Sequence, residues 1–76
     1  NMDMKPDKIS VIISVYKNTE ALAIILKSLE QQTSYPDEVI ISEDGNSKEM
    51  QNFINTFQTS LNIKHITQSD MGWRKN

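Results

Sequence analysis

Two short segments contain residue types that could bind a planar heterocycle. One is Ser14-Val15-Tyr16 and the other is Glu43-Asp44-Gly45. An aromatic ring such as that of Tyr16 can stack on a heterocycle, and the ionised carboxylate of Asp44 can accept a hydrogen bond from a ring N–H. Gly45 can adopt a positive φ and lets a ligand approach the backbone closely. Together these features would suit a uracil ring.

Each of these residues also has a purely structural interpretation. Glu43 and Asp44 could be a solvated strand end, Tyr16 a loop aromatic that packs on the following helix, and Ser14 a strand-end hydroxyl. Glu43 and Asp44 point to opposite faces if the strand persists, so they form a poor acid/base pair. The only histidine, His65, has no cysteine or second histidine as a partner. We therefore expect a solvent-facing strand histidine and no zinc site.

The composition narrows the class of protein. The chain has 76 residues, a formal net charge of -2 from 8 basic and 10 acidic residues, and no cysteine. This balance provides no basic surface for nucleic acid, and the lack of cysteine excludes disulfides and thiolate metal sites. The apolar runs are too short to span a membrane. We expect one small soluble, cytoplasmic domain, or a piece of one, with no nucleic-acid partner.

The two ends of the chain carry little information. Residues 1–7 precede the first predicted strand and are interpreted as a tail, and at least Asn1 as a processed end, because Asn1 cannot be a normal initiator. Arg74 and Lys75 could hold a phosphate, although a frayed basic terminus is the simpler explanation. No glycine-rich phosphate loop of the P-loop or dinucleotide type follows the first predicted strand.

The candidate residues lie where predicted strands end. Short segments rich in β-branched residues indicate strands, and apolar residues at i, i+3, i+4 and i+7 indicate amphipathic helices. The strands are expected at residues 8–15, 38–43 and 61–67, and the helices at residues 20–32 and 47–59. This β-α-β-α-β order predicts an α/β fold with a mostly parallel sheet.

Polar residues mark the predicted helix starts. Asn18 or Thr19 is a credible N-cap of the first helix. Asn46 followed by Glu49 has the form of a capping box before the second helix.

The predicted topology can leave one face of the sheet bare. If both right-handed crossovers step the same way, both helices cover one face, and the other face exposes Ile12 and Ile40. A half-covered parallel sheet is rare in soluble proteins. We therefore expect that the native chain continues beyond Asn76 and that this fragment forms a homo-oligomer through the uncovered face.

Taken together, the chain resembles the opening of a family 2 glycosyltransferase with the GT-A fold. The resemblance is carried by residues 9–18 (ISVIISVYKN), 26–33 (LKSLEQQT) and 37–47 (DEVIISEDGNS), which keep the family's order and spacing. It implies that residues 8–76 are the nucleotide-binding half of a truncated, three-layer Rossmann-like domain. The family typically has proline at position 14, asparagine at position 17 and aspartate at position 43.

The resemblance also implies roles for individual residues. Ser14, Val15 and Tyr16 would line the nucleoside pocket, and Asp44, followed by Gly45, would accept a hydrogen bond from uracil N3–H. Residues 68–76, which contain Arg74, are similar to the family's segment that passes the diphosphate. The form of residues 72–74 (GWR) resembles members that build surface polysaccharides.

The activity that the resemblance implies belongs to the whole protein. It would be an inverting, metal-dependent transfer of a sugar from a nucleotide-sugar, a uridine diphosphate sugar, to a glycan or lipid-linked acceptor. A divalent metal, manganese or magnesium, is expected only in the full-length enzyme. The family's Asp-X-Asp metal motif and its catalytic base have no counterpart in these 76 residues. We therefore assign no catalytic or metal residue here and expect the fragment to be inactive alone.

Two other classes of protein remain open. A receiver-like α/β module would place an acid pair after the first strand, where this chain has Ser14 and Tyr16. A structural or interaction module would use the uncovered sheet face as its partner surface. Nucleotide binding at Tyr16 and Asp44 would separate the glycosyltransferase interpretation from the second of these.

Overall fold

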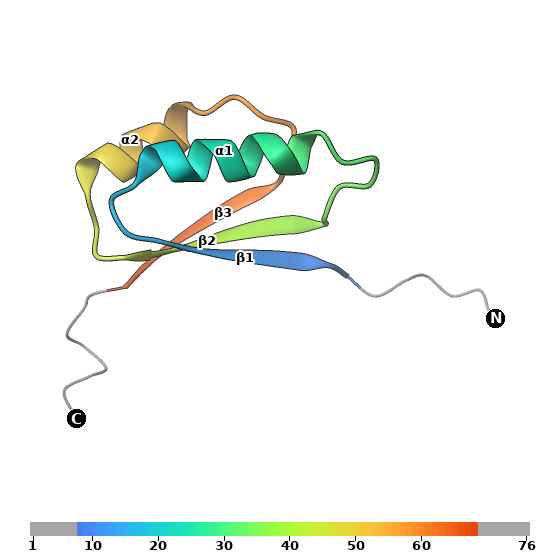
Figure 1. Cartoon of the computed structure of the whole chain (residues 1–76). Helices are drawn as coiled ribbons and strands as arrows, with labels where there is room; N and C mark the ends of the chain where they lie inside the picture. Colours follow the sequence, from blue (N-terminus) through green and yellow to red (C-terminus); the bar gives the residue numbers. More distant parts are fainter. Residues whose placement is uncertain (1–7, 69–76) are drawn as a thin grey trace.

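The structure, a computed structural model, describes residues 8–68 and alternates three strands with two helices (Figure 1). In chain order these are β1 (Ser10–Val15), α1 (Thr19–Glu30), β2 (Glu38–Asp44), α2 (Lys48–Thr56) and β3 (Ile63–Gln68). The predicted β-α-β-α-β order is confirmed, although both helices end two or three residues earlier than predicted. Residues 1–7 and the segment that contains Arg74 lie outside the described residues.

The three strands form one parallel sheet in the order β1-β2-β3. Both helices lie on the same face of this sheet, so both crossovers step in the same direction (Figure 1). The described residues therefore supply the sheet and one helical layer of a truncated Rossmann-like fold. Ser14 pairs with Ser42, and Val15 pairs with Glu43. As a result, the carboxyl ends of β1 and β2 lie side by side.

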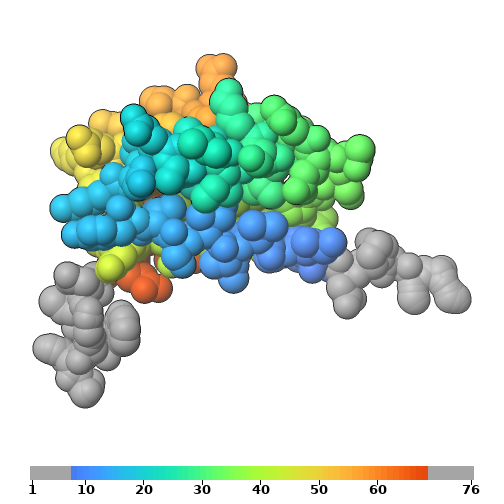
Figure 2. Space-filling view, in the orientation of Figure 1, coloured from blue at the N-terminus to red at the C-terminus, as the bar shows by residue number. Residues whose placement is uncertain are grey.

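The core lies between the sheet and the helices. Its buried side chains come from all three strand regions and both helices: Ile13, Leu22, Leu26, Val39, Ile41, Met50 and Leu61. Figure 2 shows the side chains of α1, in cyan and green, as a continuous layer against those of β1, in blue. Burying one leucine completely stabilises a fold by about 1.5–3 kcal/mol. Leu22 and Leu26, both 0% exposed, therefore fix α1 on the sheet.

The opposite face of the sheet carries the other side chains of each strand. Ile12 is 67% exposed and Ile66 is 46% exposed, while Ile40 between them is half-buried. No described helix or strand covers this face, as we expected for two crossovers that step the same way. Self-association through the face stays a prediction.

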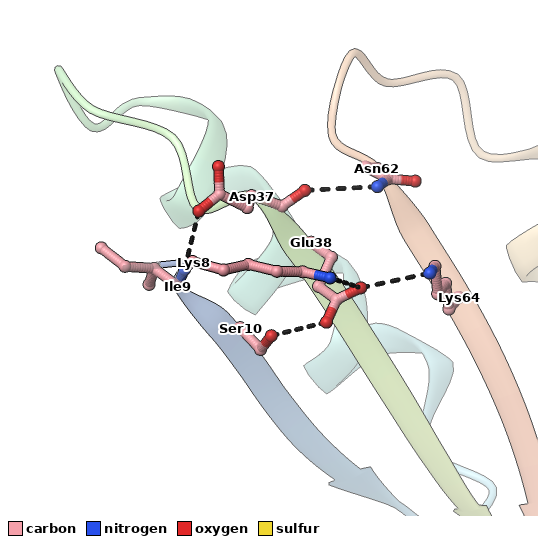
Figure 3. Close-up of polar contacts among 7 residues, drawn as sticks. All are labelled: Lys8, Ile9, Ser10, Asp37, Glu38, Asn62 and Lys64. Carbon is pink, nitrogen blue, oxygen red and sulfur yellow. Dashed lines mark hydrogen bonds and ion pairs between the residues drawn. The ribbon is translucent and has the colours of Figure 1, made fainter. Parts of the chain in front are cut away.

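A polar network joins the amino ends of the three strands (Figure 3). The backbone N–H of Ile9 donates to Asp37 Oδ2 at 2.7 Å, and Asn62 Nδ2 donates to the Asp37 carbonyl at 3.2 Å. Beside them, the almost fully covered carboxylate of Glu38 accepts from Ser10 Oγ at 2.5 Å. Lys64 Nζ and Lys8 Nζ lie 3.2 Å and 3.6 Å from its other oxygen.

Acidification is expected to remove the stability that Glu38 contributes. The Ser10 hydroxyl, followed by Lys64 and Lys8, holds the pKa of Glu38 below its ordinary value of 4.5. A carboxylate with a lowered folded pKa stabilises the fold fully above the ordinary value and loses this effect as the pH falls through the folded value. Urea unfolding at pH 7 and pH 3 should show that Glu38→Gln is less stable than wild type only at pH 7. Glu49→Gln, at an exposed position, is the matched control, and an equal Glu38→Gln deficit at both pH values would contradict the expectation.

Candidate functional site

A cleft of about 370 Å³ opens at the carboxyl ends of β1 and β2. Its lining residues come from the two loops that follow these strands: Tyr16, Lys17, Asp44, Gly45, Asn46 and Ser47. Figure 1 shows both loops at the same end of the sheet, where they lead into α1 and α2. Ligands of open α/β sheets bind at this edge, and small-molecule sites have volumes from about 300 Å³ upward. The position and size of the cleft therefore suit a small ligand.

The structure brings together three of the predicted site residues. Tyr16, which is 61% exposed, shares the cleft with Asp44 and Gly45. Ser14 and Val15 do not line it, because Ser14 lies exposed on the uncovered face and Val15 packs against the core. Whether these residues bind a nucleotide stays a prediction, as does the role of Arg74 outside the described residues.

Gly45 turns the chain from β2 toward α2. Its φ is 97°, a conformation that side-chain-bearing residues rarely adopt. A Cβ at this position would meet no atom within 4 Å, so the restriction is one of backbone conformation and not of space. The Gly45 N–H donates to the Gln68 carbonyl at 2.7 Å, which ties the floor of the cleft to the end of β3.

Lys17 is a cleft residue that the sequence interpretation missed. Its φ of 60° is left-handed, which costs a residue with a side chain about 1–2 kcal/mol. Its ammonium lies 5.3 Å from the centroid of the Tyr16 ring. The family's usual asparagine at position 17 was the available signal, because asparagine adopts left-handed conformations more readily than lysine.

Glu43 directly precedes the cleft residue Asp44 in β2 and is 1% exposed. Its Oε2 accepts from the Ser47 N–H at 2.8 Å, and its Oε1 is hydrogen bonded to His65 Nε2, also at 2.8 Å. The solvated-strand-end alternative is therefore wrong for Glu43, although Asp44 is exposed. The prediction of a solvent-facing His65 is also wrong: its side chain is 15% exposed, because its position in β3 places it on the helix-facing side of the sheet.

The buried Glu43 also changes the start of α2. Ser47 is the N-cap, with its Oγ accepting from the Met50 N–H at 3.0 Å, so the capping box predicted from Asn46 is wrong. In a capping box the N-cap N–H bonds to a glutamate three residues later. Here the glutamate of β2 accepts that N–H, so one carboxylate joins the strand to the helix across the cleft loop. The Asn18 cap of α1 is confirmed, because its side chain accepts from the Ala21 N–H at 2.9 Å.

Within residues 8–68, no group of three or more histidine, aspartate or glutamate side chains is placed to hold a metal ion. Neither described helix has the length and apolarity needed to cross a membrane.

An open parallel sheet with helices along it and a cleft at its carboxyl edge defines the general class of open α/β folds, whose ligands bind at that edge. Within that class, residues 10–76 match Glycosyl transferase family 2, and the chain belongs to this family. It is 36% identical over 69 residues to the chondroitin synthase of Escherichia coli, covering 90% of this chain and 10% of that protein.

Other relatives show the same partial coverage. The hyaluronan synthase of Pasteurella multocida is 31% identical over 67 residues, which are 87% of this chain and 7% of that protein. A validoxylamine A glucosyltransferase of Streptomyces hygroscopicus subsp. limoneus is 32% identical over 68 residues, which are 87% of this chain and 15% of that protein. The chain thus spans 15% or less of the length of these relatives. No solved structure was found to match it significantly.

Proposed function

We propose that this chain is the nucleotide-binding part of a glycosyltransferase that uses a uridine diphosphate sugar as its donor. The observation that carries the proposal is the cleft, in which an exposed aromatic ring and an exposed carboxylate meet at the edge of the sheet. Tyr16 would stack on the uracil ring, Asp44 would accept from N3–H, and Gly45 would leave room for the ligand beside the backbone.

The acceptor in the proposed reaction is a glycan or a lipid-linked acceptor. Two of the relatives are named as synthases of chondroitin and hyaluronan, which are polysaccharides, and this supports a sugar chain as the product. We propose a cytoplasmic location for the reaction, consistent with a chain that contains no cysteine.

The transfer itself is proposed to invert the anomeric carbon and to need a divalent metal, manganese or magnesium. Such a metal would stabilise the charge of the departing diphosphate. A base would remove the acceptor proton as the new bond forms. We assign donor binding to this part of the protein and propose that the 76-residue chain alone transfers no sugar.

Titration with uridine diphosphate tests the proposal. Amide chemical shifts of the labelled chain should change in the two cleft loops, at residues 14–18 and 43–46. Asp44→Asn should weaken binding about tenfold, because a hydrogen bond to a charged acceptor contributes about 1.5 kcal/mol or more. Glu30→Gln removes one charge at the far end of α1 and should bind as wild type does. A folded wild-type chain without shifts in either loop would contradict the proposal.

A further inference from the structure

The proposed uracil contacts do not account for Lys17. Two local preferences oppose a lysine here: the backbone is left-handed, and the positive charge directly precedes Asn18, the N-cap of α1, where the helix dipole is also positive. A neutral asparagine or glycine at this position would avoid both the backbone strain and the charge repulsion. Residues that break local rules in this way concentrate at functional sites.

The charges in the cleft have a simple arrangement. Asp44 lies at the end of β2 and Lys17 follows β1, with the Tyr16 ring next to the lysine. Among the described lining residues, Lys17 carries the one positive charge and Asp44 the one negative charge. A ligand that fits this pattern has an N–H donor on a planar ring and an anionic group elsewhere. A nucleoside diphosphate has both, whereas a nucleoside lacks the anion.

The contact that Lys17 now makes can be exchanged for another. Its ammonium lies 5.3 Å from the Tyr16 centroid, and both side chains are exposed. A cation–π contact at an exposed site is weak, so an ion pair with a phosphate can replace it. The Tyr16 ring would then be available to stack on the uracil base.

We propose that Lys17 is a specificity-determining residue that recognises the diphosphate of the donor. This inference rests on the proposed function, because it assumes that the base occupies the cleft at Tyr16 and Asp44. It makes Lys17 one reason why the cleft prefers a nucleoside diphosphate to the bare nucleoside.

The test compares the dissociation constants of uridine and uridine diphosphate for the 76-residue chain. The quantity of interest is their ratio. In Lys17→Gln the preference for the diphosphate should fall about fivefold, the effect of one exposed ion pair. Glutamine keeps the Cβ of lysine and loses its charge, so the strain of the left-handed backbone stays about the same. Lys17→Arg should retain the preference, and so should Lys27→Gln, which removes a charge at the other end of α1. Raising the ionic strength should reduce the preference more in wild type than in Lys17→Gln.

The experiment distinguishes a failure of the proposed Lys17 role from a failure of the proposed function. If both ligands shift the cleft amides and Lys17→Gln keeps the wild-type ratio, the role of Lys17 is refuted and the proposed function stands. If neither ligand shifts the cleft amides of the folded wild-type chain, the proposed function fails, and the role of Lys17 fails with it.

Discussion

Replacing Glu43 by alanine is expected to lower the free energy of unfolding by about 3 kcal/mol, because it leaves the part-buried Ser47 N–H and His65 ring without their carboxylate partner. The carboxylate is 1% exposed and bonds both the Ser47 N–H and His65 Nε2. The substitution removes both bonds at once and opens a gap under the cleft loop. In a domain of this size the total stability is near the lower end of the usual 5–15 kcal/mol, so a large part of it would be lost.

Urea unfolding at neutral pH would measure this loss. Glu43→Gln keeps one oxygen that can accept from the Ser47 N–H, so it should lose less stability than the alanine variant. Glu49→Ala, at an exposed position in the first turn of α2, is the surface control. If Glu43→Ala and Glu49→Ala lose the same amount, the buried network does not hold the loop. The folded fraction of Glu43→Ala should also bind uridine diphosphate more weakly, because the turn at Gly45 loses its anchor.

Leu22→Ala is expected to lower the free energy of unfolding by about 3 kcal/mol, within the range observed for buried leucines. Leu22 is 0% exposed and lies in the first turns of α1, directly after the loop that carries Tyr16 and Lys17. Alanine would leave a cavity between the helix and the sheet, where the surrounding side chains can relax only in part.

The same helix provides the control for this prediction. Ile24 is 68% exposed, so Ile24→Ala removes a similar number of carbon atoms from a position in contact with water. Its effect should stay within about 0.5 kcal/mol. Thermal unfolding of the two variants beside wild type would compare them, and equal losses would mean that α1 does not pack on the sheet through Leu22.

The elements of this fold could be predicted because local pattern and tertiary environment agree. β1 has β-branched residues on both faces, and Leu22 and Leu26 fall on one stripe of α1. Helix ends were less predictable. Residues after Thr56 continue a helical pattern in sequence, but Phe57 has an extended backbone with ψ of 120°, which no side-chain periodicity indicates.

The candidate site was predictable only in part, because contacts between distant elements and single backbone angles leave no pattern in the sequence. Tyr16 and Asp44 could be paired, because both follow parallel strands that end at the same edge. The burial of Glu43 could not be predicted from the sequence, since it depends on contacts with His65 from β3 and with the Ser47 N–H. The importance of Lys17 depends on a backbone angle, and the residue type alone argues against that angle.

The central place of β2 has a consequence for the dynamics of the cleft. β2 is hydrogen bonded to a strand on each side, whereas β1 is bonded on one side only among the described strands. Local opening starts where few neighbours hold the backbone. The half of the cleft that carries Asp44 is therefore expected to be the more rigid half, since the half that carries Tyr16 and Lys17 follows the edge strand of the described sheet. A ligand would meet a preformed acceptor on one side and an adjustable aromatic and cationic loop on the other, so binding would slow amide hydrogen exchange mainly after β1.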